Sequence, residues 1–159
     1  MSNDKMLVKT LNYIKKNKSL FEKQSLKNNQ QNKIVLLADS TAYQNSKFEH
    51  KYTFDEAKEY CSNLEYAKYD DWRLPTSREL KKLIVKDTNV TNQYGYLNFM
   101  HASFIENLPN KKRIVFWTSY DKSKKYPNNA SGVNFTKGKS FTYKKSSKNY
   151  VMCVKEESF

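Results

Sequence analysis

Two short motifs of the form Thr-x-x-Glu do most to limit how this chain can fold. Thr53 is followed three residues later by Glu56, and Thr76 is followed three residues later by Glu79. In such a capping box, each of the two side chains satisfies a backbone N–H group at the start of a helix. We therefore predict two helices, one from residue 54 to about residue 64 and one from residue 77 to about residue 85.

Apolar residues after each capping box recur at helical spacing, so each helix should bury one face. This spacing directs Cys61 into the core. Pro75 favours an extended backbone in the residue before it, just ahead of the second helix. The predicted core residues are Phe54, Ala57, Cys61 and Leu64 in the first helix and Leu80, Leu83 and Ile84 in the second.

The rest of the chain carries only short apolar runs. Residues 34–38 suit a buried strand, and residues 39–51 are polar and predict a loop. After a stretch with little periodicity, 87–113, four β-like pieces follow at 114–119, 132–136, 139–143 and 150–155, with Gly138 suited to a hairpin turn. Two helices followed by several strands predict an α+β domain built on a small antiparallel sheet.

Residues 1–33 carry 8 basic and 2 acidic side chains and differ from the rest of the chain. Leu7, Leu11, Ile14 and Phe21 predict an amphipathic helix over 5–27, followed by a polar linker over 28–33. This helix could dock on a protein surface or form a homo-oligomer, lie on an anionic membrane, or remain a loosely ordered tail. We predict that the folded domain spans 34–159.

A basic, aromatic segment extends from Lys111 to Lys148, where eleven cations stand against the single acid Asp121. Such a segment attracts polyanions, and its rings can stack on sugars or bases. Because 26 of the 29 cations of the chain are lysine, a merely solvated lysine-rich face is the alternative. Trp117 could belong to the binding surface or to the core. The candidate ligand-binding residues are Lys111, Lys112, Arg113, Trp117, Lys122, Lys124, Lys125, Tyr126, Lys137, Lys139, Tyr143, Lys144, Lys145 and Lys148.

Motifs for catalysis or cofactor binding are not found in the sequence. His50 and His101 have no cysteine or histidine at metal-ligand spacing, and the three glycines form no phosphate-binding pattern. Helix capping explains Glu56 better than acid–base catalysis does. We therefore expect no metal, no cofactor and no enzymatic activity.

The sequence DWRLPT, residues 71–76, has a structural interpretation. Trp72 and Leu74 would alternate with Arg73 along a short strand, so that the indole is buried and the guanidinium pairs with a carboxylate, either Glu56 or Glu79. Pro75 and Thr76 would then start the second helix.

The stretch from Tyr52 to Leu80, YTFDEAKEYCSNLEYAKYDDWRLPTSREL, resembles the opening of the Lcl C-terminal domain family. Later pieces are also similar to this family: FWTSY at 116–120, GVNFTKG at 132–138 and YVMCVK at 150–155. The resemblance covers roughly 34–155 and implies a C-type lectin-like fold, with two helices flanking small antiparallel sheets. The Glu-Pro-Asn type of calcium-binding loop is missing from this sequence, so we do not expect calcium-dependent sugar binding.

The resemblance also implies a disulfide between Cys61 and Cys153, which would join the first helix to the last strand. Two buried free thiols are the alternative. A disulfide would favour the periplasm or the cell surface, although the sequence shows no signal peptide and no run of about 20 apolar residues for a membrane span.

Three functions are compatible with this sequence. The first is a non-catalytic binding or adhesion module for an anionic glycan or another polyanion. The second is a structural interaction module, docked by its amino-terminal helix into a homo-oligomer or a cell-envelope assembly. Nucleic-acid binding ranks below both because the chain has no recognisable motif for reading bases.

Overall fold

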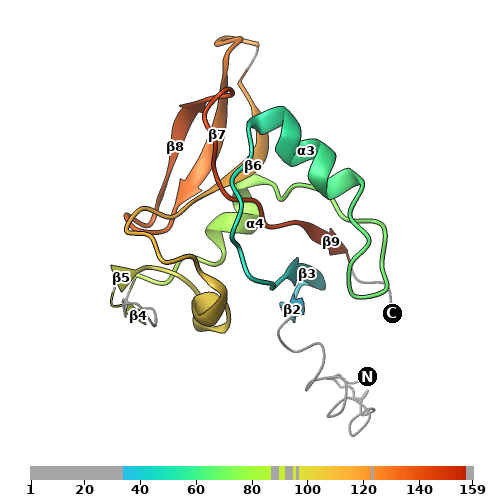
Figure 1. The fold of residues 1–159 in the computed structure, drawn as a ribbon, viewed down its shortest axis with the longest axis vertical. Coiled ribbons are helices and arrows are strands. Elements are labelled where there is room, and N and C mark those ends of the chain that lie inside the picture. The colour runs from blue at the N-terminus through green and yellow to red at the C-terminus, as the bar shows by residue number, and fades with distance from the viewer. Residues whose placement is uncertain (1–33, 87–89, 92–94, 96, 123, 157–159) are drawn as a thin grey trace, which may run out of the picture. The chain divides into compact units, whose positions relative to one another are not determined.

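Both predicted helices are present in the computed structural model, which describes residues 34–86, 90–91, 95, 97–122 and 124–156 (Figure 1). Helix α3 spans Phe54–Ser62 and helix α4 spans Ser77–Lys81. Each begins with the predicted capping box, with both side-chain-to-backbone hydrogen bonds formed. The helix predicted over 5–27 and the linker predicted over 28–33 lie outside the described residues.

Helix α4 ends four residues earlier than the sequence predicted. After Lys81 the backbone bonds tighten, since Leu83 N donates to Leu80 O and Ile84 N donates to Lys81 O. Bonds over three residues give tight turns in place of an α-helix. Leu80 and Leu83 are nevertheless buried as predicted, while Ile84 is half-buried.

The first sheet has the strand order β2-β3-β9, formed by Ile34–Leu36, Thr41–Gln44 and Val154–Glu156. Strand β3 corrects the prediction of a polar loop over 39–51. All four of its residues are buried, and it pairs antiparallel with β9. Gln44 tolerates burial because its side chain accepts a hydrogen bond from Cys153 N (2.9 Å) and donates one to the Tyr60 hydroxyl (3.0 Å).

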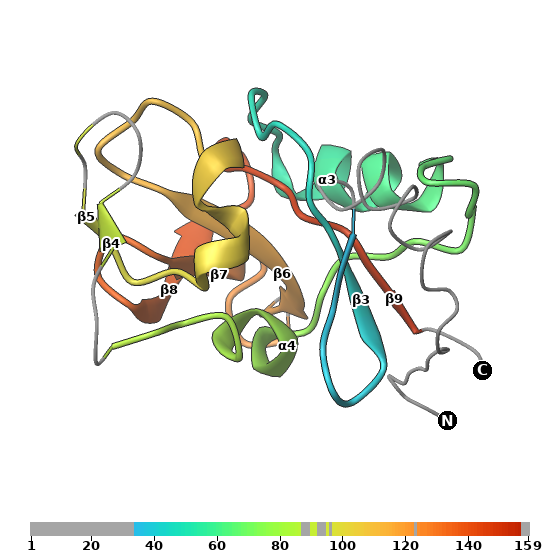
Figure 2. The same cartoon turned by 90° about the horizontal axis from the view of Figure 1, so that it is seen from below.

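A second antiparallel sheet has the order β6-β7-β8, formed by Val115–Asp121, Asn129–Asn134 and Lys139–Lys144. These strands match three of the predicted β-like pieces, and Gly138 turns the β7–β8 hairpin with a φ of 69°. Figures 1 and 2 both place β8 on the side of this sheet away from α3.

The stretch 87–113, which the sequence left without regular structure, contains short elements. Strands β4 (Val90–Thr91) and β5 (Leu97–Asn98) form a small antiparallel ladder. They precede a 3₁₀ helix, η1, at Ala102–Asn107. His101 starts this helix, since its Nδ1 accepts a hydrogen bond from Ser103 N.

An aromatic core lies between the two larger sheets and the helices. The ring of Phe116 contacts Phe48, Phe135 and Tyr150, and the ring of Trp117 contacts Phe54 of α3. The predicted α+β class, with two helices flanking small antiparallel sheets, is therefore confirmed. No helix within the described residues has the length and hydrophobicity needed to cross a membrane.

The predicted disulfide is confirmed. Cys61 of α3 and Cys153, just before β9, are bonded with a Cα–Cα distance of 5.6 Å. Both residues are fully buried. The bond joins two parts of the chain that are 92 residues apart.

Candidate functional site

The cations of the segment 111–148 gather mainly at the two ends of the β6-β7-β8 sheet. We call the first group the tip cluster, because it lies at the β6–β7 connection and the end of β8; it consists of Lys122, Lys124, Lys125, Lys144 and Lys145. We call the second group the turn cluster, because it lies at the β7–β8 turn; it consists of Lys111, Lys112, Arg113, Lys137 and Lys139.

Backbone pairing brings the tip cluster together. Asn129 pairs across the sheet with Lys144, and Lys145 N donates to Asn128 O at 2.8 Å. Lys145 Nζ also lies 2.8 Å from Asp121 Oδ1, so the one acid of the segment compensates this lysine. Two exposed rings accompany the cluster. Tyr120 is 56% exposed and Tyr126 is 49% exposed.

One side chain holds the turn cluster together. The hydroxyl of Thr136 donates to Lys112 O (2.9 Å) and accepts from Ile114 N (3.0 Å). The segment 111–113 therefore lies against the β7–β8 turn, which carries Lys137. Three consecutive cations, at 111–113, therefore lie near the turn that carries Lys137 and Lys139, more than 20 residues later in the chain.

A row of two rings, Phe141 and Tyr143, lies between the clusters on one face of β8. Their centroids are 6.4 Å apart, as expected for side chains two positions apart on a strand. Lys137 Nζ lies 5.8 Å from the centroid of Phe141, and the guanidinium carbon of Arg113 lies 5.5 Å from that of Tyr143. These distances suit cation–π contacts, so the turn cluster and the rings form one mixed surface.

Trp117 does not belong to this surface, which corrects its inclusion among the candidate ligand-binding residues. Its side chain is fully buried, and its indole N–H donates to Tyr52 O at 2.7 Å. Its ring packs beneath Tyr143 of this surface, and the centroids of the two rings are 6.2 Å apart. Burial raises the pKa of Tyr143, so this residue contributes a neutral hydroxyl.

The turn cluster continues into a hollow that sequence analysis missed. This hollow of about 600 Å³ lies between the end of α4 and the β7–β8 turn, and its lining residues are Lys81, Ile84, Lys86, Gly138, Lys139 and Ser140. Lys81 and Lys86 lie in the middle third of the chain, where basic and acidic residues are nearly equal in number. No local pattern could have assigned them to the basic surface.

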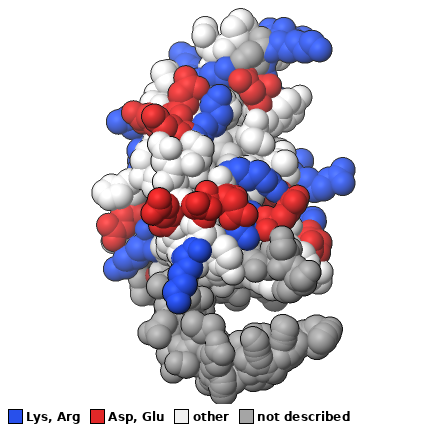
Figure 3. Space-filling view, turned by 90° about the vertical axis from the view of Figure 1, so that its right-hand side faces the viewer, with Lys and Arg blue, Asp and Glu red and all other residues white. Residues whose placement is uncertain are grey.

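The stretch that includes α3 is rich in acidic side chains. Between residues 52 and 71 there are six acidic side chains and two lysines. Figure 3 looks at the right-hand side of Figure 1, where α3 lies, and shows acidic side chains in a band across that face, with basic ones around it. Lys148, unlike the other candidate lysines, belongs to neither cluster. It lies close enough to Glu56 to help lower the pKa of that carboxyl.

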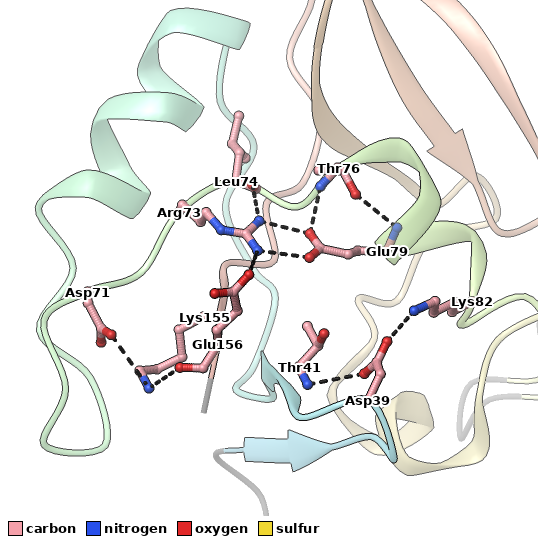
Figure 4. Close-up of polar contacts among 10 residues, drawn as sticks. All are labelled: Asp39, Thr41, Asp71, Arg73, Leu74, Thr76, Glu79, Lys82, Lys155 and Glu156. Carbon is pink, nitrogen blue, oxygen red and sulfur yellow. Dashed lines mark hydrogen bonds and ion pairs between the residues drawn. The ribbon is translucent and has the colours of Figure 1, made fainter. Parts of the chain in front are cut away.

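DWRLPT does not form the predicted short strand: Arg73 makes an isolated β-bridge with Val154, and the predicted side-chain contacts are present (Figure 4). Trp72 is buried, and Arg73 donates two hydrogen bonds of 2.8 Å to the carboxylate of Glu79, the second of its two predicted partners. Burial acts to raise the pKa of Glu79, but the hydrogen bonds from Arg73 and Thr76 outweigh it and hold the pKa below its usual value. A carboxylate oxygen of Glu156, in β9, lies 3.8 Å from a guanidinium nitrogen of Arg73.

Two exposed rings of the surface, Tyr120 and Phe141, were not among the sequence candidates. The alternation of Lys139, Phe141 and Tyr143 along a strand could have identified Phe141. No group of three or more potential metal ligands occurs within the part of the chain that the structure describes.

Residues 16–155 match the Lcl C-terminal domain family. The chain belongs to this family. The match begins before residue 34, where sequence analysis placed the start of the domain. No curated protein matches the chain.

Among solved structures, the chain is similar to the carbohydrate-recognition domains of the mouse and human scavenger receptor C-type lectins. The mouse domain has 16% sequence identity and a TM-score of 0.40, and the similarity covers 80% of this chain and 96% of that one. The human domain has 14% identity and a TM-score of 0.39, with coverage of 79% and 97%.

Proposed function

We propose that this chain is a non-catalytic binding module that recognises an anionic glycan or another linear polyanion through the β6-β7-β8 sheet. The observation that carries the proposal is the arrangement of two cation clusters around a row of rings. Among the described residues, Lys145 is the single cation of the two clusters with an ion-pair partner. The other nine cations keep their charge available for a ligand.

The arrangement favours a linear ligand. The two ends of β8 are five residues apart, which corresponds to about 17 Å along a strand and separates the two clusters. A chain with repeated anionic groups can reach both clusters, and the faces of its sugar rings can pack on Phe141 and Tyr143 between them. A single anion can reach only one cluster.

Lysine dominates both clusters, and this determines the kind of recognition expected. An ammonium acts as a point charge, whereas arginine offers a planar, bidentate fork. Binding should therefore follow the charge density of the ligand more than its detailed stereochemistry. Because charges more than about 8 Å apart are screened at 0.15 M salt, affinity should fall steeply as salt is added.

The test uses heparin as the polyanion and three double variants with the same change in charge. Lys124→Glu with Lys125→Glu alters the tip cluster, and Lys111→Glu with Lys112→Glu alters the turn cluster. Lys47→Glu with Lys68→Glu is the control, because both lysines are exposed and belong to neither cluster. Elution from immobilised heparin and the unfolding midpoint are measured for each.

Both cluster variants should elute from heparin at clearly lower salt than the control. Their unfolding midpoints should differ little from that of the unaltered chain, as is usual for substitutions of exposed residues. Equal shifts in all three variants would show that only net charge matters, and the proposed surface would be wrong. The structural module docked by residues 5–27 remains a prediction outside the described residues.

A further inference from the structure

A second hollow, of about 520 Å³, lies between α3 and the extended segment before it. We call it the α3 hollow, and its lining residues are His50, Lys51, Tyr52, Glu56, Glu59, Tyr60 and Asn63. None of these residues belongs to the tip or turn cluster. A ligand of the α3 hollow is therefore distinct from the polyanion of the proposed function.

Two tyrosines form the aromatic part of the α3 hollow. The rings of Tyr52 and Tyr60 stack with centroids 5.0 Å apart and an interplanar angle of 28°. The hydroxyl of Tyr60 accepts a hydrogen bond from buried Gln44, which is itself held by Cys153 N. The rings are thus fixed before any ligand arrives, which lowers the entropic cost of binding.

Backbone bonds fix the second tyrosine as well. Tyr52 N donates to Asn149 O at 2.8 Å, and Asn149 N donates to Tyr52 O at 2.9 Å. Tyr52 O also accepts the indole hydrogen bond of Trp117. Tyr52 is therefore anchored to the core by the same contact that buries Trp117.

The carboxylates of the hollow come from one face of α3. Glu56, Glu59 and Asn63 stand at positions i, i+3 and i+7, which share a helix face. Glu56 accepts the capping bond from Thr53 N, and this bond, with Lys148, lowers its pKa. Glu59 is exposed, and within the described residues its carboxylate has no hydrogen-bond or ion-pair partner.

Nearby cations leave the charge of Glu59 uncompensated. The ammonium of Lys51 lies 5.7 Å from the centroid of the Tyr150 ring, and Lys148 acts on Glu56. Lys58 of the same helix pairs with Asp55 at 3.6 Å. Lys51 lines the hollow and Lys148 acts on Glu56, so Glu59 is the carboxylate of the hollow that is left to attract a small cation.

We propose that the α3 hollow binds a primary alkylammonium group, as carried by a lysine side chain of a peptide or by a polyamine. The carboxylates of Glu56 and Glu59 accept its charge-assisted hydrogen bonds, and the tyrosine rings offer cation–π contacts. A neutral ligand such as a sugar would use the rings but would leave the charge of Glu59 uncompensated. The observed charge pattern therefore favours an ammonium ion.

The test is a titration of the ¹⁵N-labelled full chain, followed through the amide signals of Tyr52, Glu59 and Tyr60. The probes are Nα-acetyl-lysine amide and spermidine, which represent the peptide and polyamine sources. The same lysine derivative acetylated at Nε is the uncharged control, and methyl glucoside represents a neutral sugar. Saturable shifts with the two amines and none with the neutral compounds are expected; the tighter amine identifies the source.

Substitutions locate the binding. Glu59→Gln should weaken amine binding roughly two- to five-fold, as expected for an exposed ion pair. Asp55→Asn removes the same charge from the same helix but outside the hollow, so it should change binding by less than a factor of about 1.5. Glu56→Gln keeps the capping acceptor and serves as a second hollow variant.

Three results would overturn the proposal: equal shifts with the Nε-acetylated derivative, saturable binding of methyl glucoside to the same residues, or an equal loss in the Asp55 variant. Heparin elution of Glu59→Gln is measured in parallel. It is expected to match the unaltered chain, so that a failure of the α3 hollow and a failure of the polyanion surface are told apart.

Discussion

The guanidinium carbon of Arg113 lies 5.5 Å from the ring centroid of Tyr143, so that a cation of the turn cluster contacts the row of rings on β8. This contact depends on what lies beneath the ring. Tyr143 packs over Gly132 of the neighbouring strand and makes a T-shaped contact with the ring of buried Trp117. The exposed surface is therefore shaped by a glycine and a core residue.

Replacing Gly132 by alanine should destabilise the domain and displace the ring of Tyr143. A Cβ atom at this position would lie 3.1 Å from two ring carbons of Tyr143 and 3.1 Å from the carbonyl oxygen of Phe116. That oxygen belongs to the adjacent strand β6 and cannot withdraw without disturbing the strand pairing. We expect a loss of about 1–3 kcal/mol in the free energy of unfolding, measured by urea titration.

Thr142→Ala is the control for this substitution, because Thr142 is exposed on β8. It should change the free energy of unfolding by less than about 0.5 kcal/mol. Similar stabilities of the Gly132 variant and the unaltered chain would show that the sheet relaxes around the added methyl group.

Phe141→Ala should weaken heparin binding without unfolding the domain. The ring is 38% exposed and lies between the two clusters, so its loss removes contact area from the ligand side of β8. Because stacking on an exposed ring is worth about 1–3 kcal/mol per base in single-stranded nucleic acids, a decrease of roughly five-fold or more is expected. Calorimetry at fixed salt measures it, and Leu36→Ala, an exposed apolar residue outside the surface, should leave the affinity unchanged.

Local signals in the sequence predicted the helices well. A capping box needs only four neighbouring residues, and both boxes, at Thr53 and at Thr76, form as predicted. Strand β3 was missed because its polar residues are satisfied from far away. The side chain of Gln44 accepts a hydrogen bond from the backbone N–H of Cys153, which lies 109 residues later in the chain.

The sequence predicted most residues of the candidate site but not how they are arranged in space. A count of charges found the segment 111–148, yet it could not show that Lys81 and Lys86 join the turn cluster or that Lys148 lies beside Glu56. The burial of Trp117 also depends on a long-range contact, the hydrogen bond to Tyr52 O. Such contacts follow from the tertiary fold and have no local signature.

The Arg73–Glu79 pair should make stability depend on pH. The pKa of Glu79 is lowered in the folded chain, so the pair stabilises the fold above the ordinary carboxyl pKa and this contribution is lost as the pH falls through the lowered value. Glu79→Gln keeps the capping acceptor but loses the charge. It should cost about 1–2 kcal/mol at pH 7 and progressively less below about pH 4.5.

Urea titrations at pH 7, 5 and 3 measure this difference. Glu59→Gln is the matched control, because Glu59 has no partner within the described residues. A constant difference between the Glu79 variant and the unaltered chain at all three pH values would contradict an electrostatic contribution from the pair.

Loss of the Cys61–Cys153 disulfide should be the most destabilising of these changes. The bond closes a loop of 92 residues and restricts the unfolded chain, which corresponds to about 4–5 kcal/mol in the chain-entropy treatment. The double variant Cys61→Ala with Cys153→Ala should therefore unfold at much lower urea, and reduction of the unaltered chain should produce a similar shift. Each single variant should resemble the double variant, because either one already removes the cross-link. An unchanged midpoint after reduction would show that burial of the two sulfurs and not the covalent bond holds α3 against the segment before β9. Two thiols that alkylate in the native chain before reduction would show that the disulfide is absent.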